Sequence, residues 1–359
     1  MPIDEIVPSA SGFFIADAHC DALSEHHSDR RPLARPARPG HFDLDRAREA
    51  RVALQIFAVF IDKEDHRETT FLQAVNLIDA FTTEAAQPGS VLRPALWRED
   101  VDESPAHAGS AVAGVLSVEG GEVLQGSLAA LRALYLLGVR CLGLTWNYAN
   151  ELADTALDER PDGGLQPFGR EVVAEMGRLG MAVDVSHLSK RGFWEVADLV
   201  PGPFLASHSS AQALSAHARN LDDRQLAEIG RQRGFVGVNF CPEFLGTPSE
   251  VVSEVSLDTV ARHLAHMALK AGPGSVGLGS DFDGISATPV GLEGVEKLPT
   301  LIPALERVGF SKGEIQGILG GNLVRCLSAI LPPTPPLDAP GRLAAGLRFL
   351  HEPKAGDAS

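Results

Sequence analysis

Histidines and carboxylates follow several short apolar segments of this 359-residue chain, at the point where each segment ends. The first group is DAHCD at residues 17–21, which comes directly after the apolar residues 13–16. Side chains on a β-strand alternate between its two faces, so His19 and Asp21 would point the same way, about 6.6 Å apart along the backbone. That separation suits two ligands of one metal ion. The pattern His-x-Asp is common by chance, however, and needs partners from elsewhere in the chain.

Such partners follow later apolar segments of the sequence. The polar or aromatic residues at these segment ends are Glu119, Trp146, His187, His208 and Asp281. Three histidines and two or three carboxylates are too many for one tetrahedral zinc site, but they suit two metal ions that share a bridging carboxylate. Each of these residues alone could equally be structural. Their recurrence at successive segment ends favours a metal centre over coincidence.

The elements that would position these residues alternate regularly between strand and helix patterns. Strands are expected at residues 13–16, 52–61, 111–118, 140–145, 181–186, 203–207, 235–240 and 275–280. Helices are expected at residues 43–51, 69–86, 127–137, 169–179, 222–231 and 257–271, with Ser189 capping a further one. This alternation predicts an α/β fold, a (β/α)8 TIM barrel whose chemistry lies at the carboxyl ends of the strands. A doubly wound open sheet is the alternative, because counting strands does not show closure.

The end of the chain predicts a short addition to the barrel. Residues 311–331 have a helical pattern, and the proline-rich residues 332–336 would stop that helix. We therefore predict one barrel domain over residues 1–331 and a proline-rich tail over residues 332–359, docked through a short helix at 342–350. His263 and His266 have helical spacing on an outer helix, and we expect them on its solvated face.

Composition limits the partners of the protein. The formal charge of −16 at pH 7 repels phosphate backbones and anionic lipid surfaces, which argues against nucleic acid and membrane partners. No segment approaches the roughly 20 apolar residues of a membrane span, and the first residues do not resemble a signal peptide. The four cysteines are far apart in the sequence. These features predict a cytoplasmic protein with a small-molecule substrate, and they are compatible with a homodimer.

Six motifs spread over the chain resemble those of the renal (membrane) dipeptidase family, the M19-type zinc metallopeptidases of the amidohydrolase superfamily. The motifs are DAHCD (17–21), SVEGG (117–121), DVSH (184–187), SHSSA (207–211), ARN (218–220) and GSDFDG (279–284). The resemblance implies two zinc ions per chain, bridged by Glu119 and a hydroxide that attacks the peptide bond. One zinc would be held by His19, Asp21 and Glu119, and the other by Glu119, His187 and His208.

The resemblance also implies roles for two further residues. Asp281 matches the family's aspartate that takes the proton from the bridging water and returns it to the leaving amine. Arg219 matches the residue that binds the free carboxylate of the substrate, and a guanidinium suits that task because it can make a paired, charge-assisted contact. Asp283 is expected to be a turn or cap residue. The implied activity is hydrolysis of dipeptides with a free C-terminal carboxylate, L-D as well as L-L.

Two positions depart from the family pattern and leave the substrate open. Trp146-Asn147 stands where the best-known members carry a histidine that polarises the scissile carbonyl, and we expect both residues to bind substrate. An indole N–H donates one hydrogen bond but carries no positive charge. Cys241 stands where some members carry a tyrosine. The alternatives are an amidohydrolase acting on another small amide, an N-acyl amino acid, a lactam or a lactone, and a non-catalytic barrel used for binding.

Overall fold

Eight parallel strands close into a barrel in the computed structural model, which describes residues 12–24, 33–34, 40–62, 69–157, 163–246 and 255–335. In chain order, the barrel strands are β1 (Ile15–Cys20), β2 (Val52–Phe60), β4 (Val112–Glu119), β5 (Val139–Gly143), β6 (Ala182–Asp184), β7 (Leu205–Ala206), β8 (Phe235–Val238) and β9 (Val276–Leu278). The ring closes because β1 pairs with β9 and β2 pairs with β4. The predicted TIM barrel is therefore confirmed, and the open sheet is excluded.

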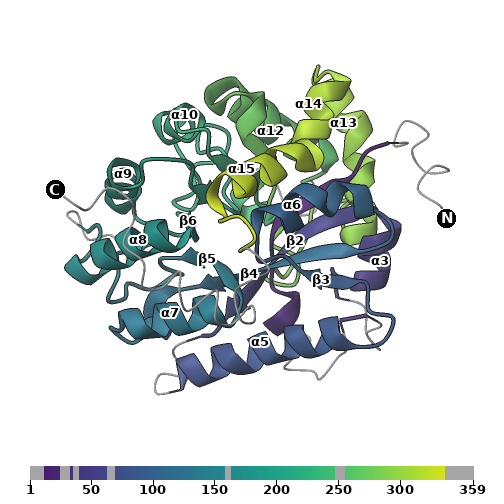
Figure 1. Cartoon of the computed structure of the whole chain (residues 1–359). Coiled ribbons are helices and arrows are strands. Elements are labelled where there is room, and N and C mark those ends of the chain that lie inside the picture. The colour runs from purple at the N-terminus through teal and green to yellow at the C-terminus, as the bar shows by residue number, and fades with distance from the viewer. Residues whose placement is uncertain are drawn as a thin grey trace.

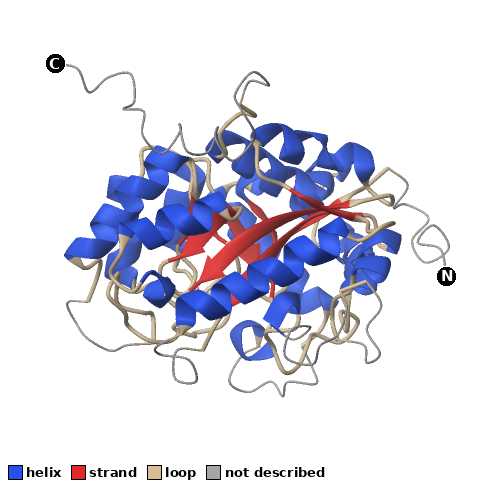
Figure 2. Ribbon diagram, turned by 60° about the horizontal axis from the view of Figure 1, so that its bottom comes forward, coloured by secondary structure: helices blue, strands red, loops and turns tan. Residues whose placement is uncertain are grey.

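Helices surround this barrel, as Figures 1 and 2 show. Their bounds are α3 (Leu44–Glu49), α5 (Thr70–Ala86), α6 (Arg98–Glu103), α7 (Leu128–Leu136), α8 (Pro167–Leu179), α9 (Lys190–Leu199), α10 (Asp223–Arg231), α11 (Pro242–Leu245), α12 (Leu257–Ala271), α13 (Leu301–Arg307), α14 (Lys312–Gln316) and α15 (Asn322–Ile330). The predicted cap of α9 is confirmed, since the Ser189 hydroxyl accepts a hydrogen bond from the Gly192 N–H at 3.1 Å. No helix within the described ranges is long and apolar enough to cross a membrane.

One strand and three helices, α6, α11 and α13, were not predicted. The three-residue strand β3 (Leu92–Pro94) pairs in parallel with the first residues of β4, and α6 follows it. A strand this short, with an arginine and a proline, has too few residues to show an alternating pattern. The predicted helix over residues 311–331 is also divided, because a π-helical segment at Gly317–Gly321 separates α14 from α15.

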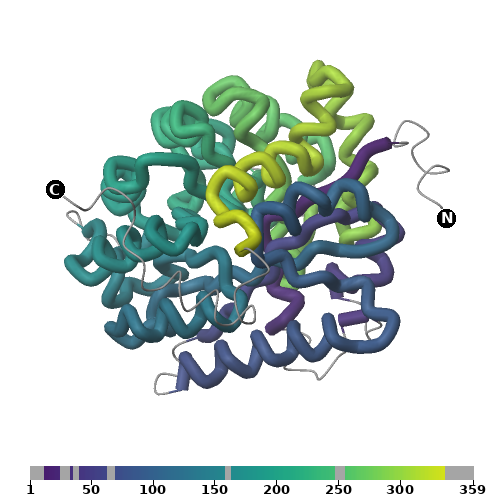
Figure 3. Tube along the Cα trace, in the orientation of Figure 1, coloured from purple at the N-terminus to yellow at the C-terminus, as the bar shows by residue number. Residues whose placement is uncertain are grey.

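The end of the described chain packs against elements from its beginning. Figure 3 shows the yellow α15 beside the purple β1, and both contact each other. One buried cluster joins apolar residues of seven barrel strands to Leu323 and Leu327 of α15. Its β4 members, Ala113 and Val115, lie well before the carboxyl end of that strand. Helix α15, the last in the described part of the chain, therefore closes the barrel at the end opposite the carboxyl ends of the strands.

Only the first residues of the predicted tail can be described. The Pro332 carbonyl accepts a hydrogen bond from the Arg98 N–H at 3.0 Å, and the Thr334 N–H donates to Glu99 at 2.7 Å. Residues 332–335 thus dock against α6. The rest of the tail, including the helix predicted at 342–350, lies outside the described residues, and the division of the chain at residue 331 stays a prediction.

Candidate active site

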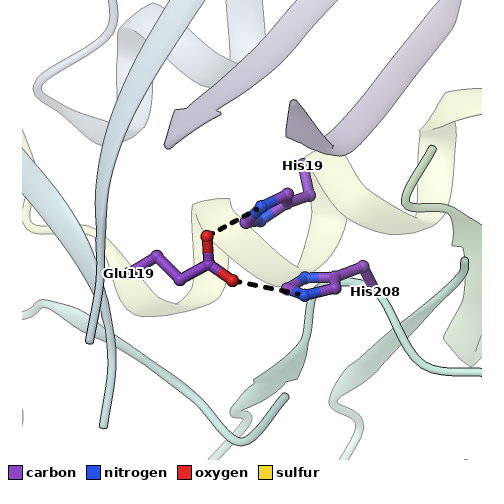
Figure 4. A group of neighbouring side chains, drawn as sticks. All are labelled: His19, Glu119 and His208. Atoms are coloured by element: carbon purple, nitrogen blue, oxygen red, sulfur yellow. Dashed lines mark ion pairs between the residues drawn. The ribbon is translucent and has the colours of Figure 1, made fainter. Parts of the chain in front are cut away.

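The predicted ligands converge at the carboxyl ends of the barrel strands. His19 lies on β1, Glu119 is the last residue of β4, and His208 follows β7 by two residues. Figure 4 shows the side chains of these three residues pointing toward one another. His187 and Asp281 follow β6 and β9 by three residues each. Five different strands therefore contribute to one cluster.

Glu119 lies at the centre of this cluster, and its two carboxylate oxygens face different partners. Oε2 lies 3.4 Å from His19 Nε2, and that nitrogen lies 3.4 Å from Asp21 Oδ2. Oε1 lies 3.0 Å from His187 Nε2 and 3.5 Å from His208 Nε2. The carboxylate is thus placed between two groups of nitrogen and oxygen donors, as a carboxylate shared by two metal ions would be.

The donor set fits a metal ion. Both ring nitrogens of His19 and the Oδ1 of Asp21 are buried without a hydrogen-bond partner in the described part of the chain. Burying such a group without a partner costs about 1–3 kcal/mol of folding free energy, and a bound metal ion would supply the missing partner. The donor atoms of His19, Glu119 and His208 lie within 4.8 Å of one another, as do those of His19, Asp21 and Asp281. Imidazole and carboxylate donors in this number are those that zinc uses in proteins.

Burial and mutual charge shift the pKa values of the cluster. Burial lowers the pKa of His187 to about 3, and Arg219 adds to this effect. Burial, His19 and Arg219 likewise hold the pKa of His208 well below its usual value. Burial opposes ionisation of Glu119, but the neighbouring His19 and His187 outweigh it and hold the Glu119 pKa well below its ordinary range. His187 and His208 are thus neutral and Glu119 is ionised, the states in which these side chains bind metal. Burial opposes the charge of His19, but Glu119 and Asp21 outweigh it and raise the His19 pKa well above its ordinary value, so a metal ion would have to displace that proton.

The two histidines near Glu119 Oε1 are oriented by hydrogen bonds to their other ring nitrogen. His187 Nδ1 lies 2.9 Å from Asn147 Oδ1, and His208 Nδ1 lies 2.7 Å from Ser207 Oγ. The Ser207 hydroxyl donates in turn to Asp184. These contacts leave each Nε2 facing Glu119, which is how outer partners prepare a histidine for metal binding. The contact of Asn147 with His187 was not predicted, and no sequence pattern points to it.

The backbone is strained at two residues of the cluster. His187 has φ +66° and Asp281 has φ +60°, which is the left-handed region that residues other than glycine rarely adopt. Such conformations persist where surrounding contacts impose them, and they concentrate at functional sites. For Asp281, one of these contacts is the hydrogen bond from its N–H to the His19 carbonyl at 3.2 Å.

Asp281 is held beside the cluster by one of its two oxygens. Its Oδ2 accepts a hydrogen bond from Asn239 Nδ2 at 2.8 Å, while Oδ1 lies 3.9 Å from His19 Nε2. Burial raises the pKa of Asp281 above its ordinary value. Asp283 instead accepts the N–H of His41 at 2.6 Å and that of Phe42 at 3.3 Å, which agrees with the turn role expected for it. Asn239 is a further site residue that the sequence did not indicate.

A cavity of about 920 Å³ opens over the cluster, and the predicted substrate-binding residues Trp146, Asn147 and Arg219 line it. Arg219 is 3% exposed and donates from Nη2 to the His208 carbonyl at 3.3 Å, whereas its buried Nε has no partner in the described residues. The Trp146 ring packs 4.8 Å from that of Phe60. Every residue predicted for the site therefore lies in this cavity or in the cluster beneath it.

One expectation about the outer helices was wrong. His263 is 1% exposed rather than solvated, and its Nδ1 accepts a hydrogen bond from the Ala211 N–H at 3.1 Å. Its Nε2 lies 3.0 Å from the Leu245 carbonyl oxygen. Helical spacing shows that His263 and His266 share a face of α12, but it does not show that the loops after β7 and β8 cover His263.

Comparisons with known proteins give the family of the chain. A model of the membrane dipeptidase family, peptidase family M19, matches residues 5–331. An uncharacterised dipeptidase of Schizosaccharomyces pombe is 34% identical over 329 residues, which cover 87% of this chain and 80% of that protein. The dipeptidase aclJ of Aspergillus oryzae is 35% identical over 298 residues, which cover 81% of this chain and 70% of that protein.

A solved structure agrees with these relatives. The metallopeptidase of Rhodobacter sphaeroides, solved with a phosphinate mimic of the dipeptide L-Ala-D-Ala, superimposes with a TM-score of 0.81 and is 29% identical. The match covers 89% of this chain and 99% of that one. The family model thus covers the barrel and every motif that contributes to the cluster. The chain belongs to the membrane dipeptidase family, peptidase family M19, and is a metal-dependent dipeptidase.

Proposed function

We propose that this protein is a binuclear zinc dipeptidase that hydrolyses dipeptides with a free C-terminal carboxylate. The observation that carries the proposal is the position of Glu119, whose two oxygens face separate donor groups. His19 and Asp21 would hold one zinc with Glu119, and His187 and His208 would hold the other. Bound zinc would polarise the scissile carbonyl and lower the pKa of the attacking water toward neutrality.

Asp281 would move the proton of the reaction. Its Oδ2 is engaged by Asn239, so Oδ1 is the oxygen left to accept a proton from the attacking water and to return it to the leaving amine. A group that acts first as base and then as acid works best when its pKa lies near the working pH. Burial, which raises the Asp281 pKa, shifts this carboxyl in the required direction.

Arg219 would bind the carboxylate of the substrate. The guanidinium lines the cavity, and its Nε, which has no partner among the described residues, needs an acceptor there. A carboxylate can take two parallel N–H donors from one guanidinium, which makes this contact specific for a free C-terminus. Recognition of a carboxylate does not depend on the handedness of the residue that carries it. We therefore include L-D dipeptides, for which the ligand of the Rhodobacter sphaeroides structure is a precedent.

The experiment is a panel of L-L and L-D dipeptides with purified, zinc-reconstituted protein, combined with metal analysis. We expect two zinc ions per chain and turnover that a chelator abolishes. Asp281→Asn should lower kcat by about 10²-fold or more, because it removes the proton acceptor. Asp283→Asn is the matched control, since its amide oxygen can still accept the N–H of His41, the shorter of the two hydrogen bonds to Asp283. Turnover that survives chelation, or equal effects of the two substitutions, would contradict the proposal.

Two other expectations from the sequence belong to this proposal. Light scattering of the zinc-loaded protein would test the homodimer, and fractionation of the source cells would test the cytoplasmic location. The same dipeptide panel, extended to N-acyl amino acids, lactams and lactones, would show whether Trp146 and Cys241 accompany a different amide substrate.

A further inference from the structure

One end of the substrate cavity carries a carboxylate that the metal cluster does not use. Glu243 lies on α11 and lines the cavity together with Cys241, Phe244 and Arg219. The Cys241 thiol donates to Glu243 Oε2 at 2.9 Å. Among the described residues, this thiol is the hydrogen-bond partner of Glu243, and no lysine or arginine forms an ion pair with it. The charge of Glu243 is therefore available to a ligand in the cavity.

The short helix that bears Glu243 is held firmly beside the loop of Arg219. The Cys241 N–H donates to Asn239 Oδ1 at 2.6 Å, immediately before Pro242 begins the helix. From the Arg219 loop, Asn220 Nδ2 donates to the Phe244 carbonyl at 2.8 Å. The Phe244 ring also lies 5.8 Å from the Arg219 guanidinium. These contacts hold the backbone that carries Glu243 beside the Arg219 loop, at one end of the cavity.

The order of the strands around the barrel indicates which residue of a bound dipeptide lies at the end of the cavity that carries Glu243. Around the ring the order is β1, β2, β4, β5, β6, β7, β8 and β9, so β7 and β8 lie across the mouth from β2 and β4. Arg219 and Glu243 follow β7 and β8, whereas Phe60 ends β2. A substrate with its carboxylate on Arg219 and its scissile bond over the central cluster places its N-terminal residue toward β2 and β4. The side chain of its C-terminal residue then lies next to Glu243.

From this arrangement we propose that Glu243 is a specificity-determining residue that selects dipeptides with a basic C-terminal residue, lysine or arginine. The inference rests on the proposed function, because it uses the carboxylate contact of Arg219. That contact neutralises the guanidinium and leaves Glu243 as the charge to be matched at this end of the cavity. A lysine or arginine side chain supplies the matching cation, while a glutamate side chain would be repelled.

The first test compares kcat/KM for Ala–Lys with that for Ala–norleucine, which has a side chain of similar length and no charge. Glu243 is at the exposed rim, so the preference for Ala–Lys should be about fivefold, the upper range for an ion pair in contact with water. Added salt should reduce it. Glu243→Gln should bring the ratio toward one, and Glu243→Lys should reverse the order of Ala–Lys and Ala–Glu. Glu306→Gln, on the exposed end of α13, is the charge-matched control and should keep the wild-type ratio.

A position-swapped substrate and a binding measurement separate this inference from the proposed function. Lys–Ala should show no dependence on Glu243, since its cation lies toward β2. Calorimetry with the zinc-loaded Asp281→Asn protein measures the affinity for Ala–Lys and Ala–norleucine without turnover. Equal affinities, unchanged by Glu243→Gln, would overturn the role of Glu243 even if both dipeptides are hydrolysed. A preference for Ala–Lys that depends on Glu243 would support it even if the wild-type protein cleaves neither.

Discussion

Replacement of Asn147 by leucine tests whether the residues around the proposed metal ligands orient them for metal binding. The Asn147 Oδ1 lies 2.9 Å from His187 Nδ1, and His187 is 7% exposed. This contact requires the proton on Nδ1 and so keeps the lone pair of Nε2 directed at Glu119 Oε1, 3.0 Å away. Leucine has a similar volume and no acceptor. The variant should therefore keep the shape of the cavity around residue 147. Without the acceptor, however, neither the tautomer nor the ring orientation of His187 would be fixed.

Two magnitudes follow from this geometry. A buried donor left without its acceptor costs about 1–3 kcal/mol of folding stability. Loss of such an outer contact lowers metal affinity by about 10- to 100-fold. The loss should fall on the zinc that His187 and His208 are proposed to hold, because Asn147 hydrogen-bonds to His187 and not to His19 or Asp21. Of the two proposed zinc ions, one should thus bind weakly while the other keeps its wild-type affinity.

The assay is a titration of the metal-free protein with zinc in competition with a chromogenic chelator, repeated with cobalt to follow its ligand-field spectrum. Asn147→Asp is the matched variant, since its carboxylate accepts the same N–H, and it should retain both affinities. Unfolding of the metal-free proteins in urea measures the stability cost separately. If Asn147→Leu binds both ions as tightly as the wild type, with the same cobalt spectrum, the contact does not orient His187 and the reasoning fails.

Two further predictions concern packing at the site and charge away from it. Gly284→Ala should abolish tight metal binding, because a Cβ there would overlap the Asp21 carboxylate and lie 2.7 Å from Asp281 Oδ1. Gly313→Ala is the control. The Cβ at residue 313 would lie in open space, so this variant should bind zinc normally in the same titration. Glu175→Gln should destabilise the fold by about 1–2 kcal/mol at pH 7 in urea unfolding. The hydrogen bonds from Arg178 and Arg132 lower the pKa of Glu175 to about 2. Because both arginines are partly exposed, solvent screening reduces the contribution of these contacts to stability. A depressed carboxyl pKa contributes its stability above the unfolded value near 4.5, so the difference between wild type and variant should shrink as the pH falls from 4.5 toward 2. A difference that stays constant over this range would refute the assignment.

The arrangement of the barrel was predictable because strand and helix periods are local properties of the sequence. The segment at 52–61 is apolar apart from Gln55, as expected for a strand covered on both faces, and β2 is buried at every residue but the last. The ends of elements were less certain. Residues 203–207 read as a full strand, yet only Leu205–Ala206 pair as β7. The π-helical segment at Gly317–Gly321 depends on packing against β1 and β9, and no local pattern of apolar residues shows it.

The same difference between local and long-range information decides which residues of the candidate site could be predicted from the sequence. A parallel barrel brings all carboxyl strand ends to one mouth, so a polar residue after a strand is placed by topology alone, and Glu119 and His208 were found in this way. The residues that orient them are placed by contacts across the fold. Asn147 and His187 are 40 residues apart in the sequence, and Asn239 and Asp281 are 42 apart. No local sequence pattern predicts a contact over such a separation. The substrate specificity proposed for Glu243 also depends on the arrangement of the whole fold, because that role follows only from the position of β8 across the barrel mouth from β4.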